Sequence, residues 1–344
     1  MRNVRGTRLA TATMIALGVL CGTAAAQPVE QFYKHKQMRL IIGHAPGGDY
    51  DIAARLLADH MVKHIPGQPR IVIQNMQGAS SIIATNYLAK AAPRDGTVFA
   101  SLGRNIPLNA ATGAANLEAD PRQLGWIGGL GEFKHVCAVT GASPVKTVED
   151  VFKQETIVGS SGAGFSLSIL PTVLNRVLNT KFRVIEGYAG SPQVLLAMER
   201  GEVQGICRSF GPFKTTHAED VRTGKMRILF YFQESPFTDM PDLPSIFAFA
   251  NEDQKQYLRV AFSNGDFGRP YVTPPDVPAD RLAALRQALD ATAKDADFRA
   301  AADKMKLDVT YLAPDDLTKV MEGLFAIPKE RMEAIKAVLP ESRD

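Results

Sequence analysis

The stretch MRLIIGHAPGGDYDIAARLLADHM, residues 38–61, is the most informative part of the sequence about the fold. An apolar run comes first, a turn rich in glycine follows, and the last part spaces its apolar residues as one face of a helix does. A continuous apolar strand is typical of a sheet that is covered on both faces. The stretch therefore predicts a strand, a tight turn and a helix, the first unit of an α/β fold.

The turn itself, IGHAPGGDYD at 42–51, combines the features of an anion site with two carboxylates. Backbone N–H groups at a helix start attract anions. Asp51 fits the helix start, where a carboxylate interacts with free N–H groups. Asp49 has two interpretations: it points to solvent, or it faces a ligand that carries a positive or hydroxyl group. Tyr50 is then a candidate lid or stacking surface.

Two further strands, at 70–76 and 97–103, alternate with helical patterns and predict a doubly wound parallel sheet. An irregular pattern follows at 117–131. Between 134 and 233 a second series of short apolar strands alternates with helical stretches, which predicts a second domain. The proline-punctuated segment 259–275 indicates an extended return crossing.

The chain ends in helical patterns, which we expect to complete the first domain rather than to form a third one. One pattern runs over 279–306 and is broken near Asp295, and the other runs over 314–339. A short strand is predicted between them at 307–313.

The first 26 residues have the pattern of a secretory signal peptide, which predicts a periplasmic protein cleaved after Ala26. Three arginines precede an apolar stretch that is too short to span a bilayer comfortably. Of the 39 basic residues, those three lie in this segment, which leaves 36 against 36 acidic residues. A neutral mature chain gives no argument for binding nucleic acid or an anionic membrane.

Two cysteines remain in the mature chain, Cys137 and Cys207. An oxidising compartment permits a disulfide between them. The sequence leaves two possibilities open, a Cys137–Cys207 disulfide or two buried free thiols that act as small apolar residues.

The residues that follow the expected strands are rich in Gly, Ser and Arg. Ligands of parallel α/β sheets gather at the carboxyl ends of the strands, and small residues let backbone N–H groups approach a ligand. Arg104 and Arg208 are placed to grip a carboxylate in a forked geometry. The alternatives are ordinary tight turns for the glycines and structural ion pairs for the arginines. The candidate ligand-binding residues are Pro46, Gly47, Gly48, Asp49, Tyr50, Ser80, Ser81, Arg104, Asn105, Ser160, Ser161, Gly162, Gly164, Phe165, Ser166, Tyr188, Ala189 and Arg208.

Patterns for catalysis, metal ions and cofactors are weak in this chain. His60 and His64 have a spacing that suits a metal, but no HEXXH motif accompanies them. The run GSSGAGF at 159–165 has the wrong glycine spacing for a dinucleotide fingerprint. No nucleophile elbow is present. We therefore expect no metal, no cofactor and no enzymatic activity.

Five segments carry a resemblance to one family. They are residues 38–61, IVIQNMQGASSIIATNYLAKAAPRDGT (71–97), IVGSSGAGFS (157–166), AMERGEVQGI (197–206) and RPYVTPPDVPADRLAALRQALDATAKD (269–295). Together they resemble the solute receptors of tripartite tricarboxylate transporters, the Bug-type periplasmic binding proteins. The resemblance covers most of the mature chain in order.

The resemblance implies a two-domain Venus-flytrap fold of type II-like topology, with the ligand cleft between the domains. Residues 27–131 and 260–344 would form the first domain, and 132–259 the second. It implies a receptor, without a cofactor, that delivers a small carboxylate to membrane subunits of a tripartite transporter. We expect it to act as a monomer. The carboxylate would lie between residues 46–50 and 160–166.

Two departures from the family pattern bear on the ligand. Family members often have small or hydroxylic residues where this chain has Asp49 and Tyr50. Many relatives also have a different polar segment in place of residues 207–209. Two other functions stay open from sequence: a receptor that feeds a sensor kinase, and an exported enzyme that uses the same cleft. The enzyme would need an acid–base or nucleophile set, and none can be assembled.

Overall fold

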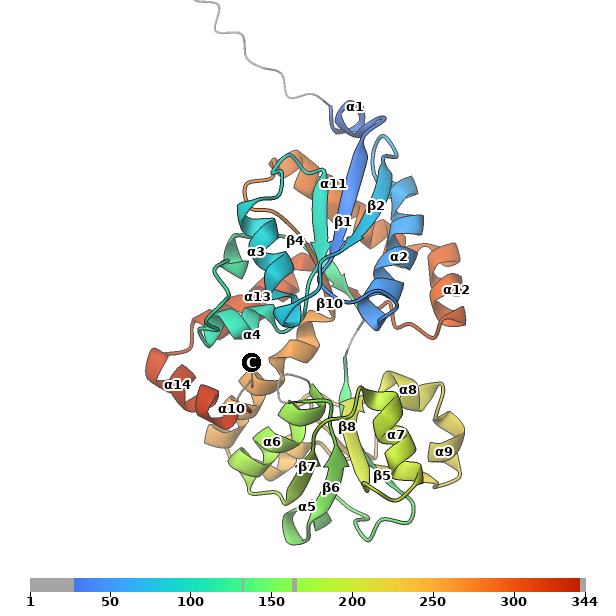
Figure 1. Cartoon of the computed structure of the whole chain (residues 1–344), viewed down its shortest axis with the longest axis vertical. Coiled ribbons are helices and arrows are strands. Elements are labelled where there is room, and N and C mark those ends of the chain that lie inside the picture. The colour runs from blue at the N-terminus through green and yellow to red at the C-terminus, as the bar shows by residue number, and fades with distance from the viewer. Residues whose placement is uncertain (1–27, 132, 163–165, 341–344) are drawn as a thin grey trace, which may run out of the picture.

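The computed structural model describes residues 28–340, except 132 and 163–165. Two sheets lie one above the other in Figure 1, each with its own helices. The predicted signal segment, Gly164 and Phe165 lie outside the described residues. None of the described helices is long and apolar enough to cross a bilayer.

The first sheet has six strands in the order β11-β4-β10-β3-β1-β2. Its strands are β1 (Gln37–Ile42), β2 (Arg70–Asn75), β3 (Val98–Ser101), β4 (Gly125–Leu130), β10 (Arg269–Thr273) and β11 (Tyr311–Leu312). Strands β1, β2 and β3 are parallel, whereas β10 is antiparallel to β3 and β4, and β11 is antiparallel to β4. The predicted parallel arrangement is confirmed for β1, β2 and β3, and the antiparallel pairs made by β4, β10 and β11 make the whole sheet mixed.

Helices cover both faces of the first sheet. One apolar core joins it to α2 (Asp49–Met61), α11 (Ala279–Lys294) and α12 (Ala296–Lys304), and α1 (Val29–Tyr33) closes its end. A second core joins it to α3 (Ile82–Lys90), α4 (Ile106–Ala111) and α13 (Pro314–Phe325). Short 3-10 turns are η1 (Val62–His64), η2 (Ala79–Ser81) and η3 (Pro121–Gln123).

The second sheet has five strands in the order β7-β6-β8-β5-β9. They are β5 (His135–Thr140), β6 (Thr156–Gly159), β7 (Phe182–Ile185), β8 (Gly205–Ser209) and β9 (Met226–Tyr231). Strand β6 is parallel to β7 and β8, and β5 is antiparallel to β8 and β9. The accompanying helices are α5 (Asp150–Lys153), α6 (Ser166–Leu178), α7 (Ser191–Glu199), α8 (Gly211–Lys214), α9 (Ala218–Arg222) and the turn η4 (Ile246–Phe249).

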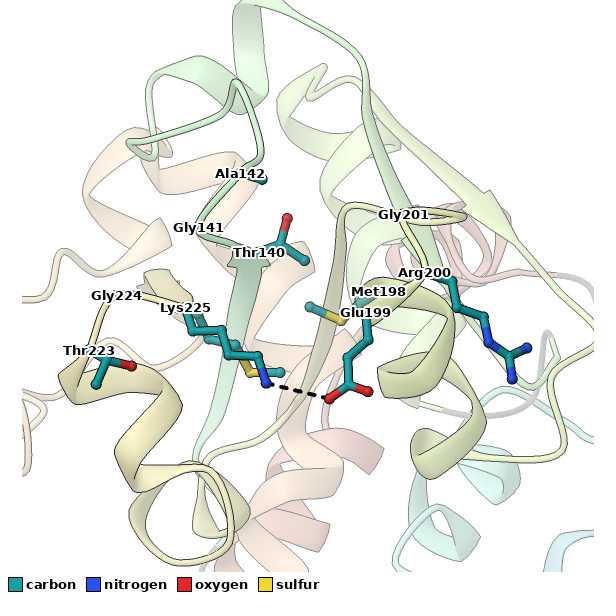
Figure 2. A pocket seen from close by; sticks show the side chains of 11 residues that line it. Thr140, Gly141, Ala142, Met198, Glu199, Arg200, Gly201, Thr223, Gly224 and Lys225 are labelled. Atoms are coloured by element: carbon teal, nitrogen blue, oxygen red, sulfur yellow. Dashed lines mark ion pairs between the residues drawn. The ribbon is translucent and has the colours of Figure 1, made fainter.

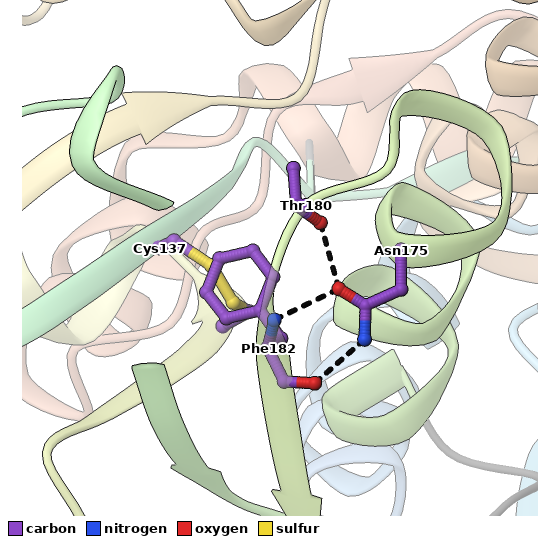
Figure 3. The surroundings of a disulfide bond; sticks show 5 residues. Cys137, Asn175, Thr180 and Phe182 are labelled. Carbon is purple, nitrogen blue, oxygen red and sulfur yellow. Dashed lines mark hydrogen bonds between the residues drawn. A yellow bond between two sulfur atoms is a disulfide. The ribbon is translucent and has the colours of Figure 1, made fainter. Parts of the chain in front are cut away.

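A disulfide joins β5 to β8 in the core of the second sheet (Figure 3). Cys137 and Cys207 lie directly opposite each other, with their Cα atoms 4.0 Å apart. Beside them, Asn175 of α6 donates to the Phe182 carbonyl and accepts from the Phe182 N–H and from Thr180. The disulfide fixes the register of the two strands, because opposite residues cannot slide once their side chains are bonded.

Two chain crossings connect the sheets. The first runs through residues 131–134, between β4 and β5, and the second follows α10 (Glu252–Phe262) through η5 (Ser263–Phe267) to β10. Helix α14 (Lys329–Val338) contacts both halves: Met332 and Ile335 lie in a core of the first sheet, and Val338 packs on the core of the second. Figure 1 shows α10 and α14 beside the two sheets.

Three predicted elements need correction. The irregular stretch 117–131 contains β4, whose glycines let α11 and β11 approach closely: a Cβ on Gly128 would lie 2.9 Å from Leu289 and 3.0 Å from the Leu312 carbonyl oxygen. The predicted extended crossing 259–275 begins as helix, and only β10 is extended. The single helix expected at 314–339 is two helices, since Pro328 precedes α14.

Candidate functional site

The loop between β1 and α2 is held by Asp51, which is buried near the helix start. Its carboxylate accepts from the Gly47 N–H at 2.9 Å, from Asn75 Nδ2 at 2.8 Å and from Arg55 Nε at 2.8 Å. The hydrogen bond from Arg55 is the main cause that holds the pKa of Asp51 well below its usual range. Gly47 has φ +76°, a conformation that favours glycine. Asp51 therefore fastens the exposed part of the loop, residues 45–48, to the first sheet.

Asp49 forms an ion pair that local sequence gives no sign of. Its two carboxylate oxygens accept from Nε and Nη2 of Arg269, both at 2.8 Å. The side chain of Arg269, the first residue of β10, is 4% exposed, whereas that of Asp49 is 51% exposed. Burial lowers the pKa of Arg269, but the hydrogen bond and charge of Asp49 outweigh it, so the pKa is raised. Asp49 therefore compensates a buried cation, a role absent from both interpretations of the sequence.

Tyr50 is buried, which corrects the expectation of a lid or a ligand-stacking surface. Its ring stacks on His44 with centroids 3.8 Å apart, and its hydroxyl accepts from the Arg104 N–H at 3.3 Å. Burial lowers the pKa of His44 to about 4; the charge of Arg104 acts in the same direction and that of Asp49 opposes it. His44 is therefore neutral at pH 7, and Tyr50 supports the loop from within.

Arg104 follows β3 and lies against the first crossing. Its Cζ is 3.7 Å from the centroid of the Phe133 ring, a cation–π contact. Its Nη1 is buried and has no hydrogen-bond acceptor among the described residues. The neighbouring Asn105 accepts from Nδ2 of Asn264, in the second crossing, at 2.8 Å. The predicted pair Arg104 and Asn105 thus lies where the first sheet meets the crossings.

Arg208 lies near the end of β8 in the second sheet. Burial lowers its pKa, and the charge of Asp49 in the first half of the molecule opposes that effect. Its Nε is buried without an acceptor in the described part of the chain. His135 starts the adjacent strand β5, and burial together with the charge of Arg104 lowers its pKa to about 3. The two predicted arginines therefore belong to facing ends of the two sheets, with neutral histidines beside them.

The serine loop of the first sheet has an unusual backbone. Ala79, Ser80 and Ser81 have φ of +44°, +50° and +80°, a conformation rare for residues other than glycine. Ser81 is buried, and its hydroxyl has no partner within the described residues. A Cβ on Gly43 would lie within bonding distance of that hydroxyl, so only glycine fits there. Backbone outliers and unpaired polar groups are features of functional sites.

The loops of the second sheet contribute the remaining candidates. Ser160 is buried, its hydroxyl accepts from the Gly162 N–H at 3.2 Å, and its carbonyl accepts from the Tyr188 N–H at 3.2 Å. Ser161 is partly buried, Ser166 begins α6, and Ala189 is exposed before α7. The turn at 160–162 and the turn at 187–190 are therefore joined by backbone contacts at one edge of the sheet.

The two histidines with metal-like spacing serve the helices around them. His64 lies 3.1 Å from the Asp295 carboxylate, and His60 packs edge-on against Phe298 with centroids 5.6 Å apart. In the described residues no group of three or more His, Cys, Asp or Glu side chains is arranged to hold a metal ion.

A separate hollow of about 740 Å³ lies at the end of β5 that is farther from the chain crossings (Figure 2). Thr140 lines it, whereas His135 marks the end of β5 that faces the crossings. Lys225 and Glu199 form an exposed ion pair there at 3.6 Å. The hollow contains none of the predicted ligand-binding residues.

Comparison with known proteins decides the family. The sequence model described as "Tripartite tricarboxylate transporter family receptor" matches residues 53–335. The chain belongs to this family. The predicted resemblance is confirmed, and the protein is a periplasmic solute-binding receptor.

Individual relatives agree with this assignment. The chain is 27% identical over 242 residues to the "UPF0065 protein in gbd 5'region" of Cupriavidus necator, covering 68% of this chain and 70% of that protein. A TctC solute-binding protein from Polaromonas has a TM-score of 0.67 at 18% identity, covering 89% and 99% of the two chains. An R. palustris protein solved with adipate has a TM-score of 0.62 at 19% identity, covering 88% and 97%. The predicted two-domain binding-protein fold is confirmed.

Sequence reasoning missed three residues of this region. Arg269 and Asn264 lie in the segment 259–275, for which the sequence predicts an extended crossing. Phe133 lies between the irregular stretch 117–131 and the strand predicted from residue 134. The only local signal for Phe133 is an aromatic residue in a short connection next to charged residues.

Proposed function

We propose that this receptor captures a small carboxylate between its two sheets and delivers it to the membrane subunits of a tripartite transporter. Its first domain would consist of residues 27–131 and 260–344, and its second domain of residues 132–259. The proposal includes cleavage after Ala26, action as a monomer and the absence of enzymatic activity.

The observation that supports the proposal is that two arginines with unused donors lie at the facing ends of the two sheets. Arg104 Nη1 and Arg208 Nε are both buried without an acceptor among the described residues. Leaving such a donor unpaired costs about 1–3 kcal/mol, more when the group is charged. An anion would restore the missing hydrogen bonds and offset both charges, because guanidinium groups pair well with carboxylates.

The surroundings support an anion over a cation. The Asp49 carboxylate is already paired with Arg269, and His44 and His135 are neutral at pH 7. Among these groups, Arg104 and Arg208 are therefore the charged side chains with a buried donor that has no acceptor in the described residues. The loops around 46–50, 80–81, 160–162 and 187–189 would form the walls of the site. The adipate in the structure of the R. palustris relative is consistent with this ligand class.

A thermal-shift panel of acetate, benzoate, malate, adipate and citrate tests the proposal, with glucose and putrescine as controls. An acid at 100 times its Kd should stabilise the protein by about 2.7 kcal/mol. Arg104→Ala and Arg208→Ala should each weaken binding by about 1.5–3 kcal/mol. Arg94→Ala is the matched control, because Arg94 lies in an exposed pair with Asp276. Stabilisation by glucose or putrescine and by none of the acids would refute the ligand class.

A further inference from the structure

Phe133 lies between two guanidinium groups. Arg104 Cζ is 3.7 Å and Arg269 Cζ is 4.9 Å from the centroid of its ring. Both distances are within the range of cation–π attraction. Phe133 belongs to the first crossing, whereas the two arginines come from the end of β3 and the start of β10. One ring in the connection between the sheets thus contacts two cations of the first sheet.

The two guanidinium groups differ in their other hydrogen bonds and ion pairs. Arg269 donates twice to Asp49, and its Nη1 donates to the Asp308 carbonyl at 3.0 Å. Arg104 has no ion pair among the described residues, and its Nη1 has no acceptor. The ring of Phe133 is therefore the main support of the Arg104 guanidinium, while Arg269 is fixed without it.

The backbone around Phe133 is closely packed. A Cβ on Gly265, in the second crossing, would lie 2.9 Å from the Phe133 carbonyl oxygen. A Cβ on Gly131 would lie 2.6 Å from Arg269 Nη1. These contacts leave the backbone at Phe133 little room to shift, which helps to keep the ring beside Arg104.

We propose that Phe133 is a positioning residue for carboxylate recognition, and that it acts by holding the guanidinium of Arg104 ready for the anion. The inference rests on the proposed function. An arginine that is free in the empty protein loses rotamer freedom when it binds, and a guanidinium already stacked on a ring loses less. The aromatic character of residue 133, and not its bulk alone, then contributes to affinity.

Calorimetric titration of acetate, benzoate, malate, adipate and citrate into the full mature chain tests this inference. Phe133→Leu keeps an apolar side chain but removes the ring, and should weaken binding about 5- to 30-fold, the equivalent of a cation–π contact of about 1–2 kcal/mol. Phe133→Tyr keeps the ring and should stay within about threefold of wild type. Phe325→Leu is the matched control, because Phe325 stacks with Arg122, whose Cζ is 4.2 Å from the ring centroid.

The double variant Arg104→Ala/Phe133→Leu separates positioning from general damage. If Phe133 acts through Arg104, the Leu substitution has no further effect once Arg104 is absent. Three results would overturn the inference while leaving the proposed function intact. Phe133→Leu could weaken binding equally with and without Arg104, Phe133→Tyr could weaken binding as much as Phe133→Leu, or Phe133→Leu could leave the affinity unchanged. Failure of all five acids to bind wild type would overturn both. Circular dichroism of each variant verifies that it is folded.

Discussion

Replacing Asp49 with Asn tests the ion pair that joins the first loop to β10. The substitution keeps the shape of the side chain and removes its charge, so the buried guanidinium of Arg269 loses its counter-ion. Removing one partner from a fully buried pair costs about 3–5 kcal/mol. Half of the Asp49 side chain is exposed, at 51%, so water already screens part of the attraction. We therefore expect the free energy of unfolding to fall by about 2 kcal/mol.

Urea denaturation at pH 7, followed by circular dichroism, measures this change. Asp276→Asn is the matched control: its ion pair with Arg94 is as short, at 2.7 Å, but both side chains are at least half exposed. The control should change stability by less than about 0.5 kcal/mol. Asp49→Asn/Arg269→Met removes both charges and should recover part of the loss. If Asp49→Asn is no more harmful than the control, the reasoning about the buried cation is refuted.

Two further predictions concern pH and the disulfide. In the unfolded chain His135 has a pKa of about 6.5 and binds a proton below that pH, whereas in the folded protein it stays neutral. The unfolded state is therefore favoured as the pH falls, and the protein becomes less stable. His135→Gln should reduce the loss of stability between pH 7 and pH 5 by about 2 kcal/mol, and denaturation curves with parallel pH dependence would contradict this. Cys137→Ala/Cys207→Ala opens a bridge between residues 70 apart in sequence and should cost about 4 kcal/mol, measured by urea denaturation. If a reductant does not change the urea denaturation curve of the wild-type protein, the result would argue against the disulfide.

Much of the first βα unit follows from local pattern, because its determinants are close in sequence. The apolar run predicts β1, the glycines predict the turn, and Asp51 bonds a residue only four positions away. The pairing of Asp49 with Arg269 spans 220 residues, and no pattern in the turn points to it. The position of Tyr50 in a turn predicts a lid or a stacking surface, but its ring stacks instead on His44, six residues earlier in the same turn.

Strand β4 shows a second limit of local reasoning. Its sequence GWIGGL has too few side chains to give an apolar run, and it is a strand because neighbouring elements approach its glycines closely. The positions of Arg104 and Arg208 after apolar strands are enough to predict them as candidates. No local pattern predicts the support of Arg104 by Phe133, because it depends on how the connection between the sheets is folded.

The attachment of α14 has a mechanical consequence. Arg176 of α6 donates to carbonyl groups at the end of α14, while Arg331 of α14 bonds Asp253 and stacks on Tyr257 of α10. Figure 1 shows α14 to one side of the molecule. Helix α14 is thus a third attachment between the two halves, in addition to the two chain crossings. We expect this attachment to limit the directions in which the two halves can rotate relative to each other.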